Sequence, residues 1–167
     1  MKITDRFIGD HKTFRKLISD IQSLTGARPS SSDRIKLARL SLFLKDHLVI
    51  HAWFEDRFFY PAVRSRIEKR SLPPITVRYF TELEKEHKSI QEQSVVLERE
   101  ANAFAPFWPQ TFSNFRQALE SHMRKEEEEL FPTAEQLLGP EGLESLSTEM
   151  ERHRSEAPRP ALRPQFI

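Results

Sequence analysis

The sequence predicts an all-α protein, an antiparallel up-down four-helix bundle with a short C-terminal helix and an extended tail. Three observations carry this prediction. Apolar residues recur at steps of three and four between charged residues, which is the period of amphipathic helices. The chain has only 4 glycines, whereas strand-rich proteins need many glycine-containing turns. Short breaks separate four long periodic segments, as is typical of antiparallel neighbours in a bundle.

Four long helical segments are expected, and proline and glycine mark the breaks between them. Ser30 to Ser32, followed by Asp33, supplies N-cap chemistry for the second segment. Pro61 is expected to kink or interrupt that segment, because it removes one backbone donor and crowds the preceding turn. The segments are 4–24, 33–68, 76–103 and 110–138, and the breaks contain Gly26 and Pro29, Leu72-Pro73-Pro74, Ala105-Pro106 and Trp108-Pro109.

The end of the chain has a different pattern from the bundle. Gly139-Pro140 closes the fourth segment, and residues 141–154 are expected to form a short fifth helix. The proline-containing tail, 156–167, is expected to be extended or disordered. We therefore divide this single domain into a bundle over residues 1–140 and a short helix with a proline-rich tail over residues 141–167.

Composition and charge exclude several classes of protein. The 26 Lys and Arg nearly cancel the 25 Asp and Glu, so a large phosphate-binding surface and a nucleic-acid partner are not expected. The absence of cysteine excludes disulfides, iron–sulfur clusters, zinc–thiolate sites and cysteine nucleophiles. No apolar run comes near the ~18 residues of a membrane span, and residues 1–20 lack a secretory pattern. We expect a cytoplasmic protein with no membrane partner.

Four of the six histidines lie at core positions, one in each long segment: His11, His51, His87 and His122. A single histidine on an apolar face is usually a core residue satisfied by one hydrogen bond. Four that project into the same core would have mainly each other as partners, and a metal ion would satisfy several imidazoles together. Two of them are followed at i+4 by Glu55 and Glu126, a spacing that places both side chains on one helix face.

The strongest signal is an internal repeat of this histidine–glutamate motif. Residues 51–61 read HAWFEDRFFYP, residues 122–132 read HMRKEEEELFP, and both fit H-x3-E-[DE]-x2-[FL]-[FY]-P. The earlier histidines also share a context, in Asp10-His11-Lys12 and Glu86-His87-Lys88. Two similar helical hairpins would thus bring four imidazoles and two carboxylates to one point. Because each glutamate can offer one oxygen to each of two metals, this donor set suits a dinuclear site.

The order H…H-x3-E…H…H-x3-E, with an aromatic residue and proline after each copy, resembles the hemerythrin-like (HHE cation-binding) domain over residues 4–138. The ferritin-like pattern differs, because it uses Glu-x-x-His. The resemblance implies a non-haem di-iron centre whose two Fe ions are bridged by Glu55 and Glu126 and by an oxo, hydroxo or water group. Imidazole and carboxylate ligands would also suit Mn or Zn. The terminal ligands implied are His11, His51, His87 and His122.

The sequence departs from the oxygen-carrying hemerythrins, whose third helix bears a fifth histidine one turn from the first. Here the turns on either side of His87 carry Leu83 and Gln91, and both bridging carboxylates are Glu, whereas one is Asp in the carriers. Fewer protein ligands leave open or water-filled metal positions, which favours reactivity over reversible carriage. A further ligand could come from Gln91, Glu84, Tyr60, His47 or solvent.

Other polar residues near the motif are expected to have lesser roles. His47 is expected either at the mouth of a cavity or as an ordinary, partly exposed side chain, and His153 is expected to be solvated. Successive residues of a helix diverge by ~100°, so most acidic neighbours of the ligands should face solvent, although one could orient an imidazole. These neighbours are Asp10, Asp56, Glu86 and Glu127.

Two classes of function follow from this interpretation. The first is a di-iron protein that binds, senses or turns over a small oxidant (O2, NO or peroxide), with peroxidase, oxidase or NO-detoxifying activity left open. Its partners would be that oxidant and a redox or signalling protein. The alternative is iron storage or donation, or an interaction module that the metal merely stabilises, without oxidant chemistry.

Overall fold

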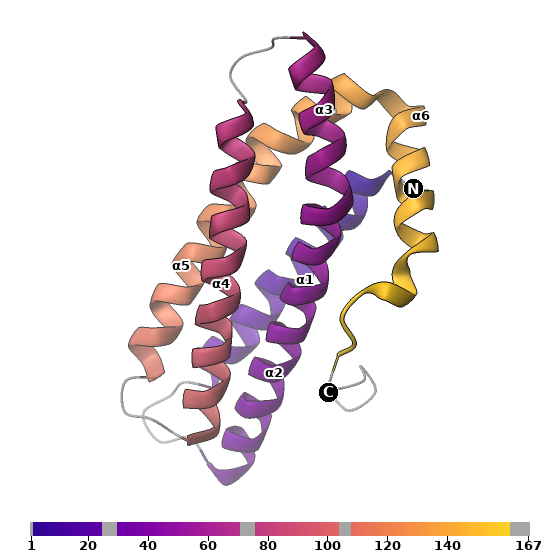
Figure 1. Cartoon of the computed structure of the whole chain (residues 1–167). Coiled ribbons are helices and arrows are strands. Elements are labelled where there is room, and N and C mark those ends of the chain that lie inside the picture. Colours follow the sequence, from indigo (N-terminus) through magenta and orange to yellow (C-terminus); the bar gives the residue numbers. More distant parts are fainter. Residues whose placement is uncertain (1, 25–29, 71–75, 104–107, 161–167) are drawn as a thin grey trace.

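The computed structural model describes residues 2–24, 30–70, 76–103 and 108–160, and these ranges contain helices and no strand. The predicted all-α four-helix bundle is confirmed (Figure 1). The bundle consists of four continuous helical segments, which we call rods. The second and fourth rods each contain two α-helices joined by one turn of π-helix. In chain order the elements are α1 (Ile3–Ser23), α2 (Ser31–Phe54), η1 (Glu55–Phe59), α3 (Tyr60–Arg70), α4 (Val77–Ala103), α5 (Trp108–Lys125), η2 (Glu126–Leu130), α6 (Phe131–Arg152) and η3 (Arg154–Glu156).

The four rods form a ring in which α1 packs against α2 and α5, and α4 packs against the same two helices. Inside the ring lie two hydrophobic clusters, one containing Phe7 and Phe54 and the other containing Phe14 and Leu48. Along the first three rods the predicted histidine lies between buried residues of the two clusters. In the fourth rod His122 lies one residue before Met123, the last buried residue of the second cluster on that rod. The bundle therefore places a polar layer between two apolar layers.

Each proline of the repeated motif follows one turn of π-helix. The N–H of Tyr60 donates to the carbonyl of Glu55, and the N–H of Phe131 donates to that of Glu126, five residues earlier in both cases. Proline lacks an N–H, and its ring crowds the preceding turn of an α-helix. The wider π-turn accommodates this conflict, so the interruption expected at Pro61 is a π-turn inside one continuous rod (Figure 1). Single π-turns inside helices are frequent at functional sites.

The described helix boundaries follow the predicted stop and start residues, with one difference. The N-cap expected among Ser30 to Ser32 is Ser30, and the structure adds a capping box between Ser30 and Asp33. The expected break at Trp108-Pro109 is wrong, because α5 begins at Trp108. Proline is tolerated in the first turn of a helix, where its missing N–H has no intrahelical partner. The breaks expected at 26–29, 72–74 and 105–106 lie outside the described residues.

The C-terminal helix folds back over the bundle at Gly139. This glycine has φ 66° and ψ 174°, and it divides α6 into the end of the fourth rod and a second helical part that begins at Pro140. Leu143, Leu146 and Met150 of that part are buried in the cluster that contains Phe7. The expected fifth helix is thus present, while the domain division at residue 140 stays a prediction. Residues 161–167 of the tail lie outside the described ranges.

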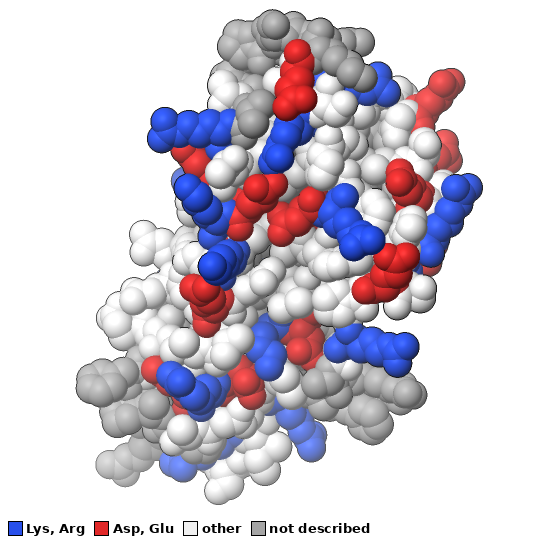
Figure 2. All heavy atoms as spheres, in the orientation of Figure 1, with Lys and Arg blue, Asp and Glu red and all other residues white. Residues whose placement is uncertain are grey.

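The surface carries mixed charge on the face shown in Figure 2. Lys and Arg are interspersed with Asp and Glu there, as the formal net charge of +1 implies. Across the described ranges, no helix combines the length and the apolar composition that crossing a bilayer requires.

The bend at Gly139 predicts that alanine substitutions at two glycines change the free energy of unfolding in opposite directions. An added Cβ meets nothing within 4 Å at either Gly139 or Gly9, so only backbone conformation decides the effect. Gly139→Ala should lower the free energy of unfolding by about 1–3 kcal/mol, because a positive φ combined with a ψ near 180° is adopted almost only by glycine. Gly9→Ala, in the middle of α1, should raise it by about 0.5–1 kcal/mol. Urea unfolding measures both, and equal effects would contradict the assigned bend.

Candidate metal centre

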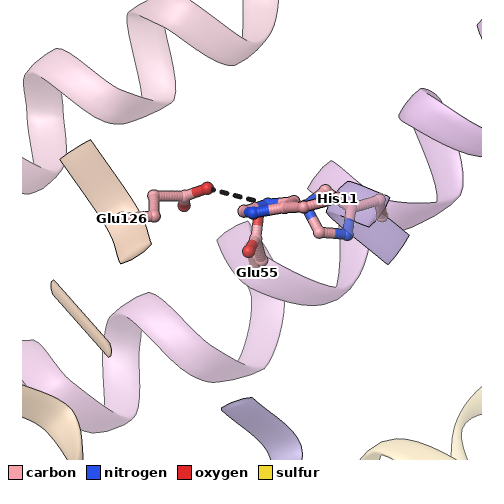
Figure 3. Close-up of side chains that lie close together, drawn as sticks. His11, Glu55 and Glu126 are labelled. Carbon is pink, nitrogen blue, oxygen red and sulfur yellow. Dashed lines mark hydrogen bonds and ion pairs between the residues drawn. The ribbon is translucent and has the colours of Figure 1, made fainter. Parts of the chain in front are cut away.

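The structure brings together all six side chains that the repeat singled out. They come from every rod of the bundle: His11 from α1, His51 from α2, Glu55 from η1, His87 from α4, His122 from α5 and Glu126 from η2. His11, Glu55 and Glu126 are 0% exposed, and the other three are at most 6% exposed. Figure 3 shows His11, Glu55 and Glu126 directed toward one another, with a dashed line for the His11–Glu126 contact. Charged groups are rarely buried like this unless they are paired or bind a cation.

Each glutamate joins the two hairpins. Oε2 of Glu55 lies 3.1 Å from Nε2 of His51 and 3.2 Å from Nε2 of His87. Oε2 of Glu126 lies 3.4 Å from Nε2 of His122 and 3.3 Å from Nε2 of His11. Each carboxylate therefore contacts the histidine of its own motif and the first histidine of the other hairpin. The sequence repeat is thus preserved in space as an approximate two-fold arrangement.

The ligand atoms form two groups that share both glutamates. One group is His11, His51, Glu55 and Glu126, and the other is Glu55, His87, His122 and Glu126. Within each group the ligand atoms lie within 4.8 Å of one another. Both oxygens of Glu55, Oε2 of Glu126 and Nε2 of His122 are buried without a hydrogen-bond partner among the described residues. Cations bound in both groups would satisfy these atoms, so the donor set fits a metal.

The four acidic neighbours of the ligands form an outer layer, and the expectation that most face solvent is wrong. Their side chains are 26–43% exposed, yet each accepts a hydrogen bond from an imidazole Nδ1. Since a carboxylate only accepts, Nδ1 carries the proton and Nε2 is left to bind a cation. The pairs are His11–Glu127 (2.8 Å), His51–Asp10 (3.1 Å), His87–Asp56 (2.7 Å) and His122–Glu86 (2.9 Å).

These outer pairs also follow the repeat. The acid before the first histidine of a hairpin binds the second histidine of that hairpin, as in Asp10–His51 and Glu86–His122. The acid after the glutamate binds the first histidine of the other hairpin, as in Asp56–His87 and Glu127–His11. Each outer carboxylate therefore binds an imidazole on a neighbouring helix and not the imidazole next to it on its own helix. The sequence signal was an acidic residue at matching positions in both copies.

The neighbouring carboxylates set the charge of the imidazoles. Burial alone would lower the pKa of His51, but Glu55 and Asp10 outweigh it and raise that pKa to about 10. The pKa of His87 is raised to about 10, again against burial, by Asp56 and Glu55. Burial would raise the pKa of Glu55, but the contacts with His51 and His87 hold it below its ordinary value. Cations are therefore favoured at this point in the core.

Among the side chains considered as a further ligand, Tyr60 lies inside the site. Its ring is stacked on His87, and its hydroxyl donates to Oε1 of Glu126 at 2.5 Å and lies 3.3 Å from Nε2 of His87. Glu84 instead pairs with Arg64 at the surface. His47 donates to the carbonyl of Phe43 and lines a groove of about 970 Å³ that reaches Asp10 and His51.

A small cavity adjoins three of the imidazoles. Its volume is about 10 Å³, close to the minimum for a single water molecule. Gln91 is the remaining candidate ligand, and it lines this cavity beside His51, His87 and His122. Most of the wall is apolar, and the lining residues are Phe14, Leu48, His51, Ala52, His87, Ile90, Gln91, Leu119, His122 and Met123.

Comparison with known protein families assigns this arrangement. A model of the hemerythrin HHE cation binding domain matches residues 2–134. The chain belongs to this family. The matched range contains all six buried ligand candidates and all four outer carboxylates, and the family description states that the domain binds cations. Searches among curated proteins and among solved structures gave no significant match.

Cation binding by this HHE domain should release protons. With pKa values of about 10, His51 and His87 are protonated near neutral pH and must lose about two protons to coordinate a metal. The apparent affinity for Mn²⁺ should therefore rise as the pH is raised, up to a pH of about 10. Calorimetry in buffers of different ionisation enthalpy measures the release. The double variant Asp10→Asn with Asp56→Asn should release fewer protons on binding. A heat of binding that does not depend on the buffer would contradict the protonation of His51 and His87.

Proposed function

We propose that the chain is a non-haem di-iron protein that binds, senses or turns over a small oxidant, which is O2, NO or peroxide. The observation that carries this proposal is the sharing of Glu55 and Glu126 by both ligand groups. A carboxylate with one oxygen for each of two ions holds them close together, and a paired site suits redox chemistry on a small molecule. Imidazole and carboxylate are the ligand types that non-haem iron takes.

The residues have distinct tasks in this proposal. Two iron ions would supply electrons and open coordination positions for the oxidant. His11 and His51 would hold one ion, His87 and His122 the other, and both glutamates would bridge them. The outer carboxylates fix the ring orientation and the proton on Nδ1, and they make each imidazole a better donor. The two apolar clusters on either side keep water from the site.

The cavity beside the imidazoles supports a small oxidant. It is bordered by His51, His87 and His122, and a volume of about 10 Å³ admits a molecule of two or three heavy atoms only after small movements of its walls. Its apolar lining favours uncharged molecules over ions. Larger organic substrates do not fit there. Reversible O2 carriage is not favoured, because the third helix has Leu83 and Gln91 where the carriers place a fifth histidine.

Tyr60 distinguishes the two ligand groups. Phe131 is its counterpart in the second copy of the motif, so the hydroxyl is present only on the His87 and His122 side. Burial raises the pKa of Tyr60 well above its usual range, and Glu126 and Glu55 raise it further. The phenol therefore keeps its proton and donates it to Glu126. We infer that Tyr60 orients this bridging carboxylate and is the side chain closest to serving as a further ligand.

One experiment tests the proposed function. The chain is purified anaerobically with ferrous iron, the iron content per chain is measured, and absorption spectra are recorded after adding O2, peroxide or NO. Two irons and a spectral change with at least one of the three are expected. Two irons without any response would favour storage, donation or a structural metal. A chain that holds only traces of metal would overturn the dinuclear assignment.

Replacing the bridging carboxylates should abolish paired binding. Glu55→Gln with Glu126→Gln preserves side-chain volume but removes both anionic bridges, so iron content should fall from two per chain to at most one. Glu84→Gln with Glu128→Gln changes the same charge at the surface and should keep both irons. Circular dichroism checks that both variants remain helical. Unchanged iron content in the first variant would show that these carboxylates are not the bridges.

Tyr60→Phe tests the bond to Glu126. Without the hydroxyl, Oε1 of this buried carboxylate loses its donor, so the free energy of unfolding of the iron-free chain should fall by about 1–3 kcal/mol. Tyr79→Phe removes a bond from a half-buried tyrosine to the carbonyl of Lys125 and should cost about 0.5–1.5 kcal/mol. A smaller loss for Tyr60→Phe than for Tyr79→Phe would contradict this role.

A further inference from the structure

A groove of about 670 Å³ runs between α1 and α5, away from the small cavity. It is unusual for its concentration of arginine in a chain whose overall charge is close to zero. Three arginines line it, and Glu120 is its one acidic lining residue. Three serines add hydroxyl donors. The arginines are Arg15, Arg116 and Arg124, and the serines are Ser19, Ser113 and Ser121.

The three arginines still have guanidinium donors that could bind an anion. Arg116 donates to the neutral amide oxygen of Gln22 at 2.9 Å. Arg124 is exposed and has no ion pair among the described residues. Arg15 binds Glu120 and Glu127, but about a third of its side chain is exposed to the groove. Guanidinium groups bind carboxylate and phosphate oxygens in pairs, and serine hydroxyls can complete such a site.

Arg15 also connects this groove to the metal centre. Its Nη1 and Nη2 donate to the two oxygens of Glu127 at 2.8 and 3.1 Å, and Oε1 of Glu127 accepts from Nδ1 of His11 at 2.8 Å. A groove-lining guanidinium is therefore only one side chain removed from a ligand imidazole. The equivalent position in the second hairpin is Gln91, which lacks a charge. On the other side of the site Lys125 pairs with Glu86, which binds His122, but Lys125 does not line this groove. Arg15 is therefore the link between the groove and the His11 side.

We propose that the α1–α5 groove binds a small oxyanion, a molecule with carboxylate or phosphate groups, and that the bound anion is coupled to the metal centre. The anion would pair with Arg116 and Arg124 and compete with Glu120 and Glu127 for Arg15. With less of its charge shared with Arg15, Glu127 accepts more strongly from His11, which becomes a better metal ligand. Coupling of this kind is reciprocal, so metal at the site would in turn raise anion affinity. The coupling rests on the proposed function, whereas anion binding does not.

Binding is tested first on the full chain without metal. Inorganic phosphate and citrate are titrated separately by calorimetry in a low-salt buffer, and their relative affinities distinguish a phosphate from a carboxylate ligand. Arg116→Ala with Arg124→Ala should weaken the tighter anion about tenfold or more, which corresponds to ~1.4 kcal/mol. Lys36→Ala with Arg39→Ala removes the same charge near the start of α2 and should leave affinity unchanged. No binding of either anion, or equal losses in both variants, would overturn the site.

Coupling is tested by metal affinity. Competition with a chelator measures Mn²⁺ affinity with and without the tighter anion, in the wild type and in Arg15→Gln. The anion should raise metal affinity in the wild type and have at most a small effect in the variant, which keeps Arg116 and Arg124. An equal anion effect in both proteins, or none in the wild type, would overturn the coupling. If the chain binds no metal, the proposed function fails, while the anion titration still decides the groove.

Discussion

The fold depends on burying two carboxylates and four imidazoles between two apolar clusters. Glu55 and Glu126 are fully buried, and only contacts within this layer compensate for the loss of water. Moving an ionised group into a protein interior is strongly unfavourable unless it is paired or bound to a cation. Three features stabilise the buried charges. They are the outer carboxylates, the raised pKa values of His51 and His87, and the hydrogen bond from Tyr60. Cations bound between the buried carboxylates would compensate for their burial most directly.

The internal repeat explains how one short motif builds such a layer. Each hairpin contributes a histidine from its first helix and the His-x3-Glu motif from its second, and the hairpins face each other with approximate two-fold symmetry. The prolines after each motif favour π-turns, and Glu55 and Glu126 each begin such a turn. Tyr60 and Phe131 follow the turns at matching positions. Their difference makes the two halves of the site chemically unequal while the backbone remains alike.

Much of the bundle and the centre of the site could be predicted from sequence because their signals are local. The i,i+4 spacing and its repetition selected His51, Glu55, His122 and Glu126 without knowledge of helix packing. An imidazole contact was expected for only one of the four outer carboxylates, because Asp10 and Glu127 reach imidazoles on neighbouring helices, which depends on the stagger between rods. Pro61 signalled a disturbance but not its form, and the hydroxyl of Tyr60 could be placed only once the π-turn was known. Trp108-Pro109 was ambiguous because proline suits both a break and a first helical turn.

The most direct test of the central claim is anomalous X-ray diffraction at the iron edge from crystals grown anaerobically with ferrous iron. The proposed di-iron assignment predicts two iron peaks, one beside His11 and His51 and the other beside His87 and His122. Both peaks should also contact Glu55 and Glu126. A single peak, or iron at surface carboxylates with none between the four imidazoles, would contradict a shared dinuclear centre.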